Sequence, residues 1–396
     1  MKPSKLTILF AAVLAALSAC KNETAELNQM IDSSFERARG QYMILAKDAL
    51  PVEGKLPRTY ENGELKTAGY GSWICGFFPG TLWELSEYYP EDQDIRSYAE
   101  QFTERVAPAQ WLTSTHDLGF MVFCSAGNAY RLTGDEKYKT MVVNAAHSLA
   151  TRFNGKTGTI MSWNPRDNWK YPVIIDNMMN LEMLMWVGKE TADSSLINIA
   201  LSHAETTIRN HFRPDYSTYH VVSYNPETGE VEYRQTLQGY SDDSAWARGQ
   251  AWGLYGYTMM YRMTGKEEFL EQAKHIAAFI ANHPRLPEDG VPYWDFDDPD
   301  IPNVPRDASA AAIMASGFLE LSTYDTGADA ERWKALAIRQ LRTLSGPEYM
   351  AEPGTNGGFL LKHSVGYLKN NSEVDVPLTY ADYYFLEALK RLKKML

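Results

Sequence analysis

Two aspartates stand where apolar segments enter apolar helical patterns, and each could act as a general acid or base. Asp176 follows the β-branched residues of Tyr171-Pro-Val-Ile-Ile-Asp176 and opens the apolar run to Trp186. Asp117 has the same setting in His116-Asp117-Leu-Gly-Phe. Burial and neighbouring charges can move the pKa of such a carboxyl group toward neutral pH. The structural alternative is a helix cap, because Asp is among the best N-cap residues.

A second group of residues suits an anionic, ring-shaped ligand. Arg248 and Trp252 are four residues apart and share one face of a predicted helix. Together they would offer a carboxylate-binding guanidinium beside an aromatic ring. The alternative for Arg248 is a salt bridge to Asp242 or Asp243. His220 lies in the loop before this helix, where it could relay a proton, bind a hydroxyl group or have a purely structural role.

The sequence predicts neither a metal site nor a cofactor site. It has no His-x-x-x-His pair, no cysteine cluster, no glycine-rich phosphate loop and no serine nucleophile elbow. The acidic segment Asp295-Phe-Asp-Asp-Pro-Asp300 lacks the spacing of a calcium loop and is interpreted as solvated. Cys75 and Cys124 belong to no Cys-x-x-Cys motif, so buried free thiols are expected, although an exported compartment would permit a disulfide between them.

The elements that must position these residues are predicted to be helical hairpins. Tyr130-Arg-Leu-Thr-Gly134 recurs as Tyr261-Arg-Met-Thr-Gly265, and each copy joins an apolar helical pattern to an amphipathic one. Thr-Gly ends the first helix, and acidic residues favour the first turn of the next. Helices are predicted over 26–49, 79–90, 94–106, 117–132, 136–154, 177–190, 192–211, 244–264, 266–283, 307–324, 328–345 and 378–394.

Short turns at one end of these hairpins and long loops at the other predict an all-α fold, an (α/α)6 toroid of six hairpins. The apolar first members should form the inner ring, and the amphipathic second members the outer ring. Asp117, Asp176 and Asp307 all fall where long loops enter inner helices, so we expect them on one rim, beside a cleft. Strand patterns are few, and residues 220–224 and 231–235 predict a small β-hairpin.

The first residues carry the features of a bacterial lipoprotein signal. Lys2 and Lys5 precede an apolar run of about a dozen residues, which is too short to span a bilayer. The run ends in Leu-Ser-Ala-Cys20, which is similar to a lipobox, where cleavage before the cysteine leads to lipidation of its thiol. We therefore expect a signal peptide over 1–19, one toroid domain over 20–396, and a lipid anchor in the bacterial cell envelope, on the periplasmic side or the cell surface. The alternative is an ordinary secretory signal with an incidental cysteine.

Charge and aromatic content narrow the class of ligand. The net charge of −12 argues against a nucleic acid partner, because such binding needs a basic face. An anionic ligand would have to be held by a few local Arg or Lys side chains. The chain contains 10 Trp, 24 Tyr and 15 Phe, many of them in predicted loops. Exposed rings suit stacking against sugars, and the alternative is that these rings form the core of a large helical protein.

Seven motifs, in order along the chain, resemble those of the unsaturated glucuronyl hydrolases of glycoside hydrolase family 88. They are Trp73-Ile-Cys-Gly-Phe-Phe-Pro-Gly-Thr-Leu-Trp83, His116-Asp-Leu-Gly-Phe120, Asp176-Asn-Met-Met-Asn-Leu181, Trp246-Ala-Arg-Gly-Gln-Ala-Trp-Gly253, Asp307-Ala-Ser-Ala-Ala-Ala312, Lys362-His-Ser-Val-Gly366 and Glu373-Val-Asp-Val-Pro-Leu-Thr-Tyr-Ala-Asp-Tyr-Tyr-Phe385. The resemblance covers nearly all of residues 26–396 and implies the same (α/α)6 fold.

The resemblance also implies an activity. The family acts on oligosaccharides left by polysaccharide lyases, which carry a 4,5-unsaturated uronic acid at the non-reducing end. An acid protonates C4, water adds at C5, and the resulting hemiketal opens and releases the rest of the chain. One carboxyl group must be protonated to donate to carbon, while a second, ionised carboxylate stabilises the cation. The implied partner is an anionic unsaturated oligosaccharide, and no cofactor is implied.

The same resemblance assigns roles to individual residues. Asp176 matches the family's acid/base, and Asp117 matches its second carboxylate, often described as the nucleophile. The implied substrate contacts are His220, Thr236, Gln238, Arg248, Trp252 and Trp163 around the unsaturated ring, Trp73 as a platform for the next sugar, and Ser364, Tyr367 and Lys369 toward sulfate or aglycone. Tyr367 stands where relatives often carry serine, so the resemblance does not extend to tolerance of sulfate.

Three other functions fit parts of the same pattern. One is an unsaturated rhamnogalacturonyl hydrolase, which shares the chemistry but takes pectin fragments. Another is an inverting glycosidase that cleaves saturated substrates on this fold. A third, from a different class, is a lipid-anchored glycan-binding protein without catalytic activity. The sequence leaves open the source polysaccharide, the sulfation preference and the oligomeric state.

Overall fold

The computed structural model describes residues 5–396, with side chains described from residue 22 onward. The predicted lipidation site, Cys20, therefore lies outside the residues whose side chains are described. Helix α1 (Lys5–Ala49) packs on the rest of the molecule through Leu27, Ile31 and Phe35. Among the described residues, none of the helices combines the length and apolarity needed to cross a membrane.

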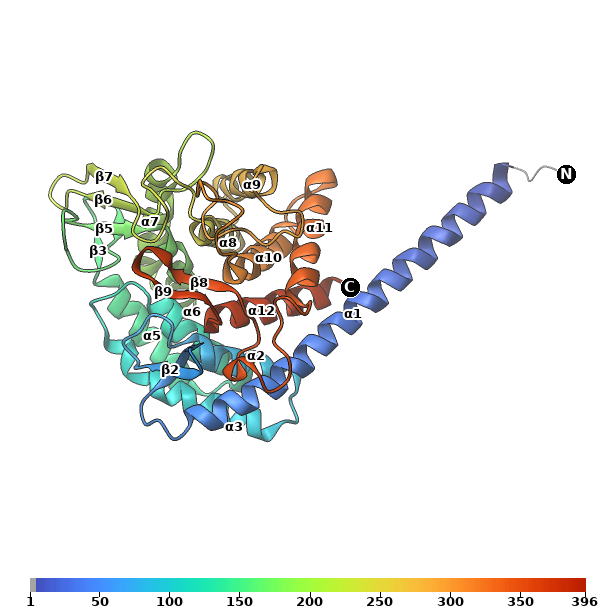
Figure 1. Ribbon diagram of the computed structural model, residues 1–396. Helices are drawn as coiled ribbons and strands as arrows, with labels where there is room; N and C mark the ends of the chain where they lie inside the picture. Colours follow the sequence, from blue (N-terminus) through green and yellow to red (C-terminus); the bar gives the residue numbers. More distant parts are fainter. Residues whose placement is uncertain (1–4) are drawn as a thin grey trace.

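An inner ring of helices surrounds one axis (Figure 1). Each member contacts the next, and contact between the first and the last closes the ring. In order, the members are α2 (Phe77–Tyr88), η2 with α4 (Gly119–Gly127, Asn128–Thr133), η3 with α6 (Ile175–Asn180, Leu181–Glu190), α8 (Ala247–Thr264), α10 (Ala308–Leu321) and α12 (Thr379–Met395). Their residues are buried on almost every side, as the all-round apolar patterns predict.

The outer ring consists of amphipathic helices, each antiparallel to an inner neighbour. They are α1, α3 (Gln93–Val106), α5 (Glu136–Ala150), α7 (Ser194–His211), α9 (Glu267–Asn282) and α11 (Gly327–Leu344). Gly134 and Gly265, both with φ of 68°, end the preceding inner helices in the left-handed conformation. All of the predicted helices are present, and the (α/α)6 toroid is confirmed.

The helix after Asp117 differs from the straight α-helix predicted there, because Gly119–Gly127 forms a π-helix. Its carbonyl groups face α2 at very close range. A Cβ atom at Gly76 would lie 2.1 Å from the Phe120 carbonyl oxygen, and one at Gly80 would lie 2.7 Å from that of Cys124. The widened turn packs here because positions 76 and 80 carry no side chain.

The strands form small sheets in the long loops. The predicted hairpin is confirmed as β6 (Val221–Tyr224) and β7 (Val231–Gln235), but the sequence reading missed β5 (Pro172–Ile174), which pairs antiparallel with β6. Other pairs are β1 (Leu56–Glu61) with β2 (Glu64–Ala68), β3 (Phe153–Asn154) with β4 (Thr159–Ile160), and β8 (Ser364–Tyr367) with β9 (Ser372–Val376). Short 3-10 turns are η1 (Ala107–Trp111), η4 (Asn356–Gly358) and η5 (Leu368–Asn370).

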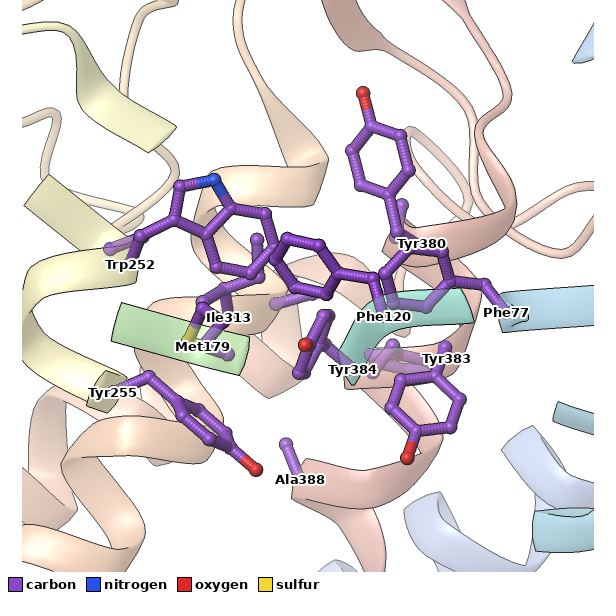
Figure 2. Packing of buried hydrophobic residues seen from close by; sticks show 14 of the residues in the cluster. Phe77, Phe120, Met179, Trp252, Tyr255, Ile313, Tyr380, Tyr383, Tyr384 and Ala388 are labelled. Carbon is purple, nitrogen blue, oxygen red and sulfur yellow. The ribbon is translucent and has the colours of Figure 1, made fainter. Parts of the chain in front are cut away.

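Aromatic side chains fill the centre of the inner ring (Figure 2). The ring centroids of Phe120 and Trp252 are 5.0 Å apart, those of Phe77 and Phe120 are 5.4 Å apart, and those of Trp252 and Tyr384 are 5.5 Å apart. Such pairs each contribute about 0.5–1.5 kcal/mol beyond the burial of their area. Many of the abundant aromatics are therefore core. Cys75 and Cys124 are free thiols, as predicted.

Candidate active site

The pairing of β5 with β6 brings Asp176 and His220 together. Ile174 lies opposite Val221, and the Ile175 N–H donates to the His220 carbonyl oxygen over 3.2 Å. Because the strands are antiparallel, the chain leaving β5 and the chain entering β6 meet at one edge of the sheet. His220 Nε2 consequently lies 3.7 Å from Asp176 Oδ2.

Backbone hydrogen bonds decide which nitrogen of His220 carries its proton. The Nδ1 atom accepts from the N–H groups of Leu237 and Gln238, each over 3.1 Å. The Thr236 hydroxyl lies 3.5 Å from the same atom. Burial and, to a smaller extent, the charge of Arg248 lower the pKa of His220 to about 3. The neutral imidazole therefore holds its proton on Nε2, which faces Asp176.

Asp176 is not a helix cap. The N-cap position of η3 belongs to Ile174, and no side chain accepts from the first turn. The Oδ2 atom of Asp176 is buried and has no hydrogen-bond partner within the described part of the chain. Burial raises the pKa of Asp176 to about 6, against the charges of His116 and Arg248, which lower it. The N-cap interpretation is therefore wrong. Asp176 is a buried carboxyl group whose pKa is raised toward neutral pH.

Asp117 has the opposite environment. Burial alone would raise its pKa, but the charge and hydrogen bond of His116 and the hydrogen bond from Thr115 bring that pKa below 3.8. His116 Nε2 lies 3.1 Å from Asp117 Oδ1, and the Thr115 hydroxyl donates to Oδ2 over 2.6 Å. The Asp117 side chain is 18% exposed and that of Asp176 10%. Two carboxyl groups whose pKa values are driven apart are suited to separate acid and anion roles.

A close helix contact holds these two carboxyl groups at the same end of the barrel. A Cβ atom at Gly119 would lie 2.7 Å from the Cα atom of Asn180, so η2 and η3 touch backbone to backbone. The Asn180 side chain accepts from the Phe120 N–H over 3.1 Å. In keeping with this placement, the charge of Asp117 contributes to the raised pKa of Asp176.

Arg248 does not pair with Asp242 or Asp243, and that predicted alternative is wrong. Its guanidinium pairs with Asp307 over 3.1 Å, donates to Gly366 O over 2.7 Å, and also donates to the Val365 carbonyl oxygen. Arg248 lies in the first turn of α8, which begins at Ala247, while the two acids lie on the preceding loop. Only the Nε atom of Arg248 is left without a partner among the described residues.

The remaining predicted contacts fall into two groups. The Gln238 N–H donates to His220, which lies beside Asp176, and the Gln238 side chain donates to Gly366 O over 3.0 Å. Trp163 pairs across a β-bridge with Thr115, which donates to Asp117, so Gln238 and Trp163 both adjoin the carboxyl pair. Lys369 acts on the pKa of His220 through its charge, which places it on the same side. Trp252 is fully buried in the aromatic core.

Three further residues were predicted as substrate contacts, namely Ser364, Tyr367 and Trp73. Ser364 is buried, and its hydroxyl lacks a partner within residues 22–396. Tyr367 is half-buried at the end of β8. Trp73 packs on Tyr380 with ring centroids 4.9 Å apart.

No role was predicted for His116, although its place directly before Asp117 was an available signal. Across the described residues, no cluster of three His, Cys, Asp or Glu could hold a metal ion.

Comparison with known proteins agrees with this geometry. A family model described as Glycosyl Hydrolase Family 88 matches residues 58–320, and the chain belongs to this family. An unsaturated glucuronyl hydrolase from Formosa agariphila is 44% identical over 82% of this chain and 80% of the relative. An unsaturated chondroitin disaccharide hydrolase from Streptococcus pneumoniae is 34% identical over 93% of this chain and 92% of its own length.

A solved structure extends the likeness to three dimensions. The crystal structure of an unsaturated glucuronyl hydrolase specific for heparin superimposes with a TM-score of 0.90 at 49% sequence identity, covering 93% of this chain and 98% of that one. These matches confirm the family resemblance found in the seven motifs and the class of enzyme, a glycoside hydrolase. They do not favour a pectin-directed relative or a catalytically inactive binding protein.

Proposed function

We propose that this enzyme releases a 4,5-unsaturated uronic acid from the non-reducing end of lyase-generated oligosaccharides, with Asp176 as the acid/base. One observation carries the assignment of the acid. Asp176 Oδ2 is buried and has no hydrogen-bond partner among the described residues, and burial raises the pKa of this carboxyl group to about 6. A large fraction of Asp176 is therefore protonated at mildly acidic pH, as donation to a carbon atom requires.

The first step is protonation of the vinyl ether. The Asp176 proton forms a bond to C4, the C4=C5 π bond breaks, and positive charge develops at C5, where the ring oxygen shares it. Asp117 stays ionised because its pKa is held below 3.8, so it stabilises this cation electrostatically. The His220 Nε2–H, 3.7 Å from Asp176 Oδ2, orients the carboxyl group or a substrate hydroxyl.

The second step adds water and restores the acid. A water oxygen bonds to C5 while the Asp176 carboxylate, now ionised, takes one of its protons. The hemiketal at C5 opens by breaking the C5–O5 bond, which leaves O5 as a hydroxyl group on C1. The C1 hemiacetal then collapses to an aldehyde and expels the remaining oligosaccharide as an alcohol. One water molecule is consumed, and the enzyme ends in its starting protonation state.

We propose unsaturated disaccharides of heparin as the preferred substrate. The heparin-specific relative is 49% identical to this chain, whereas the chondroitin disaccharide hydrolase is 34% identical. Unsulfated and chondroitin-derived disaccharides serve as the comparison substrates. If a chondroitin disaccharide is turned over at least as efficiently, the heparin preference is wrong while the hydration chemistry stands.

The activity is tested by ultraviolet absorbance. The conjugated double bond absorbs, and hydration removes it, so the absorbance of a lyase-made disaccharide should fall on addition of enzyme. A saturated disaccharide of the same sugars should stay intact. Cleavage of the saturated compound, or release of an unsaturated sugar with its absorbance intact, would indicate direct attack at the anomeric carbon and overturn the proposed mechanism.

We also propose that Cys20 carries a lipid anchor in the cell envelope. The support is the Leu-Ser-Ala-Cys20 sequence after a short apolar run. In bacterial cells, the full chain should incorporate radiolabelled palmitate and sediment with membranes, while Cys20→Ala should do neither. Equal labelling of both forms would exclude Cys20 as the lipidated residue.

A further inference from the structure

The loop between β4 and β5 carries a cation that the proposed chemistry does not use. The Arg166 guanidinium lies 4.9 Å from the ring centroid of Trp163 and 5.6 Å from that of Trp169. Backbone hydrogen bonds in both directions between Arg166 and Trp169, of 3.2 and 3.0 Å, close the loop beneath it. Cation–π contact with two indoles limits the positions that this exposed side chain can take.

Apart from the two indoles, the Arg166 guanidinium has no polar partner among the described residues. Within residues 22–396, no carboxylate lies within 4.0 Å of it, and it donates no hydrogen bond to the protein. The neighbouring Trp163 indole N–H is also buried without a partner in the described chain. The loop therefore carries two kinds of donor, a guanidinium and an indole N–H, that form no hydrogen bond within the described residues.

This loop adjoins the carboxyl pair. Trp163 is bridged to Thr115, which donates to Asp117, and the His116 N–H donates to the Ser162 carbonyl oxygen over 3.1 Å. On its other side, Trp163 and Trp169 pack with Ile174, two residues before Asp176. Arg166 is exposed and contacts Trp163, whereas Asp176 is buried, so the loop reaches from the buried carboxyl pair to the protein surface.

We propose that Arg166 is a specificity-determining residue that binds an oxyanion, a sulfate ester, on the sugar attached to the unsaturated uronate. The proposal rests on the proposed function, because it needs that uronate beside Asp176. A planar guanidinium matches the oxygen geometry of a sulfate group and is weakly hydrated, so it binds oxyanions well at an exposed site. The net charge of −12 makes such a local cation more necessary.

The test compares two unsaturated disaccharides that differ only in one sulfate on the reducing-end sugar. For Arg166→Gln, kcat/KM should fall about tenfold on the sulfated disaccharide, mainly through KM, as expected for one lost charge-assisted hydrogen bond. On the unsulfated disaccharide it should change by less than about twofold. Arg166→Lys should recover part of the loss, and added salt should reduce the sulfate preference of the wild type.

A matched control is Arg332→Gln. Arg332 also rests on an indole, 5.3 Å from the Trp333 ring centroid, but it belongs to the outer helix α11. It should leave both rates unchanged. Equal losses of Arg166→Gln on both substrates, or no loss on either, would overturn the sulfate role. A wild-type enzyme inactive on both disaccharides would instead refute the proposed function.

Discussion

Asp176 and Asp307 occupy equivalent places in the barrel and have opposite surroundings. Each follows a long loop and enters an inner helix, and both are buried. Asp307 caps α10 by accepting from the Ser309 N–H over 3.0 Å and the Ser309 hydroxyl over 2.6 Å, and it pairs with Arg248. Asp176 has no cap contact, and its Oδ2 has no partner in the described chain.

The two residues occupy the same position of the repeated helical hairpin, but the Asp307 carboxylate stabilises the fold, whereas the Asp176 carboxyl group is the proposed reactive group. The hydrogen bonds and ion pair of Asp307 offset the cost of burying its charge. For Asp176, the charges of His116 and Arg248 offset burial only in part, and the pKa of that group rises to about 6. The fold can therefore supply buried acids at its rim, while local partners decide which of them can exchange a proton.

The largest expected effect is on turnover. Asp176→Asn keeps the shape of the side chain but removes the proton donor, so kcat should fall by about 10³-fold or more while substrate binding remains. Single-turnover kinetics and equilibrium binding of an unsaturated disaccharide measure the two quantities separately. Retention of more than about a tenth of wild-type turnover would remove Asp176 from the acid role.

The next effect is on stability. Asp307→Asn leaves Arg248 buried without its ion-pair partner, which should lower the free energy of unfolding by about 3–5 kcal/mol. Chemical denaturation measures the change. The exposed Asp329 on α11 offers a control, because Asp329→Asn should change stability by less than about 0.5 kcal/mol. Similar values for the two variants would show that the Asp307–Arg248 pair contributes little.

Asp176 should make wild-type stability fall as pH rises. Its folded-state pKa of about 6 lies above the ordinary value of 3.8, so between these pH values the unfolded chain releases its proton first. This costs the wild type about 3 kcal/mol by neutral pH, and the cost is absent below pH 3.8. Asn cannot ionise, so the stability of Asp176→Asn relative to wild type should increase by that amount between pH 4 and pH 7. A constant difference across that range would contradict the raised pKa.

The smallest effect probes the cap itself. Ser309→Ala removes the hydroxyl that donates to Asp307 over 2.6 Å but keeps the backbone cap bond. We expect a loss of about 1 kcal/mol in the free energy of unfolding, with kcat on an unsaturated disaccharide within about twofold of wild type. Thermal unfolding and steady-state kinetics give both values. A large loss of kcat would show that α10 positions the reacting groups as well.

The helices were predictable because their signals are local. Apolar periodicity and Thr-Gly turns act within a few residues, so a helix is present in every predicted segment. The largest differences are at helix starts: α1 begins at Lys5 instead of residue 26, and the helices after Asp117 and Asp176 begin with a π-helix and a 3-10 helix. Strand β5 was missed because three residues carry no periodic signal and gain their hydrogen bonds from a partner at Val221–Tyr224. The pairing of this unpredicted strand with β6 places His220 beside Asp176.

The partners of individual side chains were less predictable. The nearest acids in sequence to Arg248 are Asp242 and Asp243, yet its partner is Asp307, 59 residues away. The environment of Asp176 likewise depends on tertiary burial, so sequence alone left cap and catalyst as alternatives. The resemblance named Asp176 as the candidate acid, whereas the lack of a cap contact within the described chain is a property of the folded protein.

Closure of the inner ring has a consequence for synthesis of the protein. Phe77 on the first inner helix meets Tyr380 on the last, with ring centroids 5.8 Å apart, across 303 residues of chain. At 5–20 residues per second, roughly 15–60 s separate their emergence from the ribosome. Throughout that interval, Phe77 on the nascent chain lacks the aromatic ring of Tyr380 that it contacts in the folded protein. A chain truncated before α12 would keep that surface open permanently, which favours aggregation over activity.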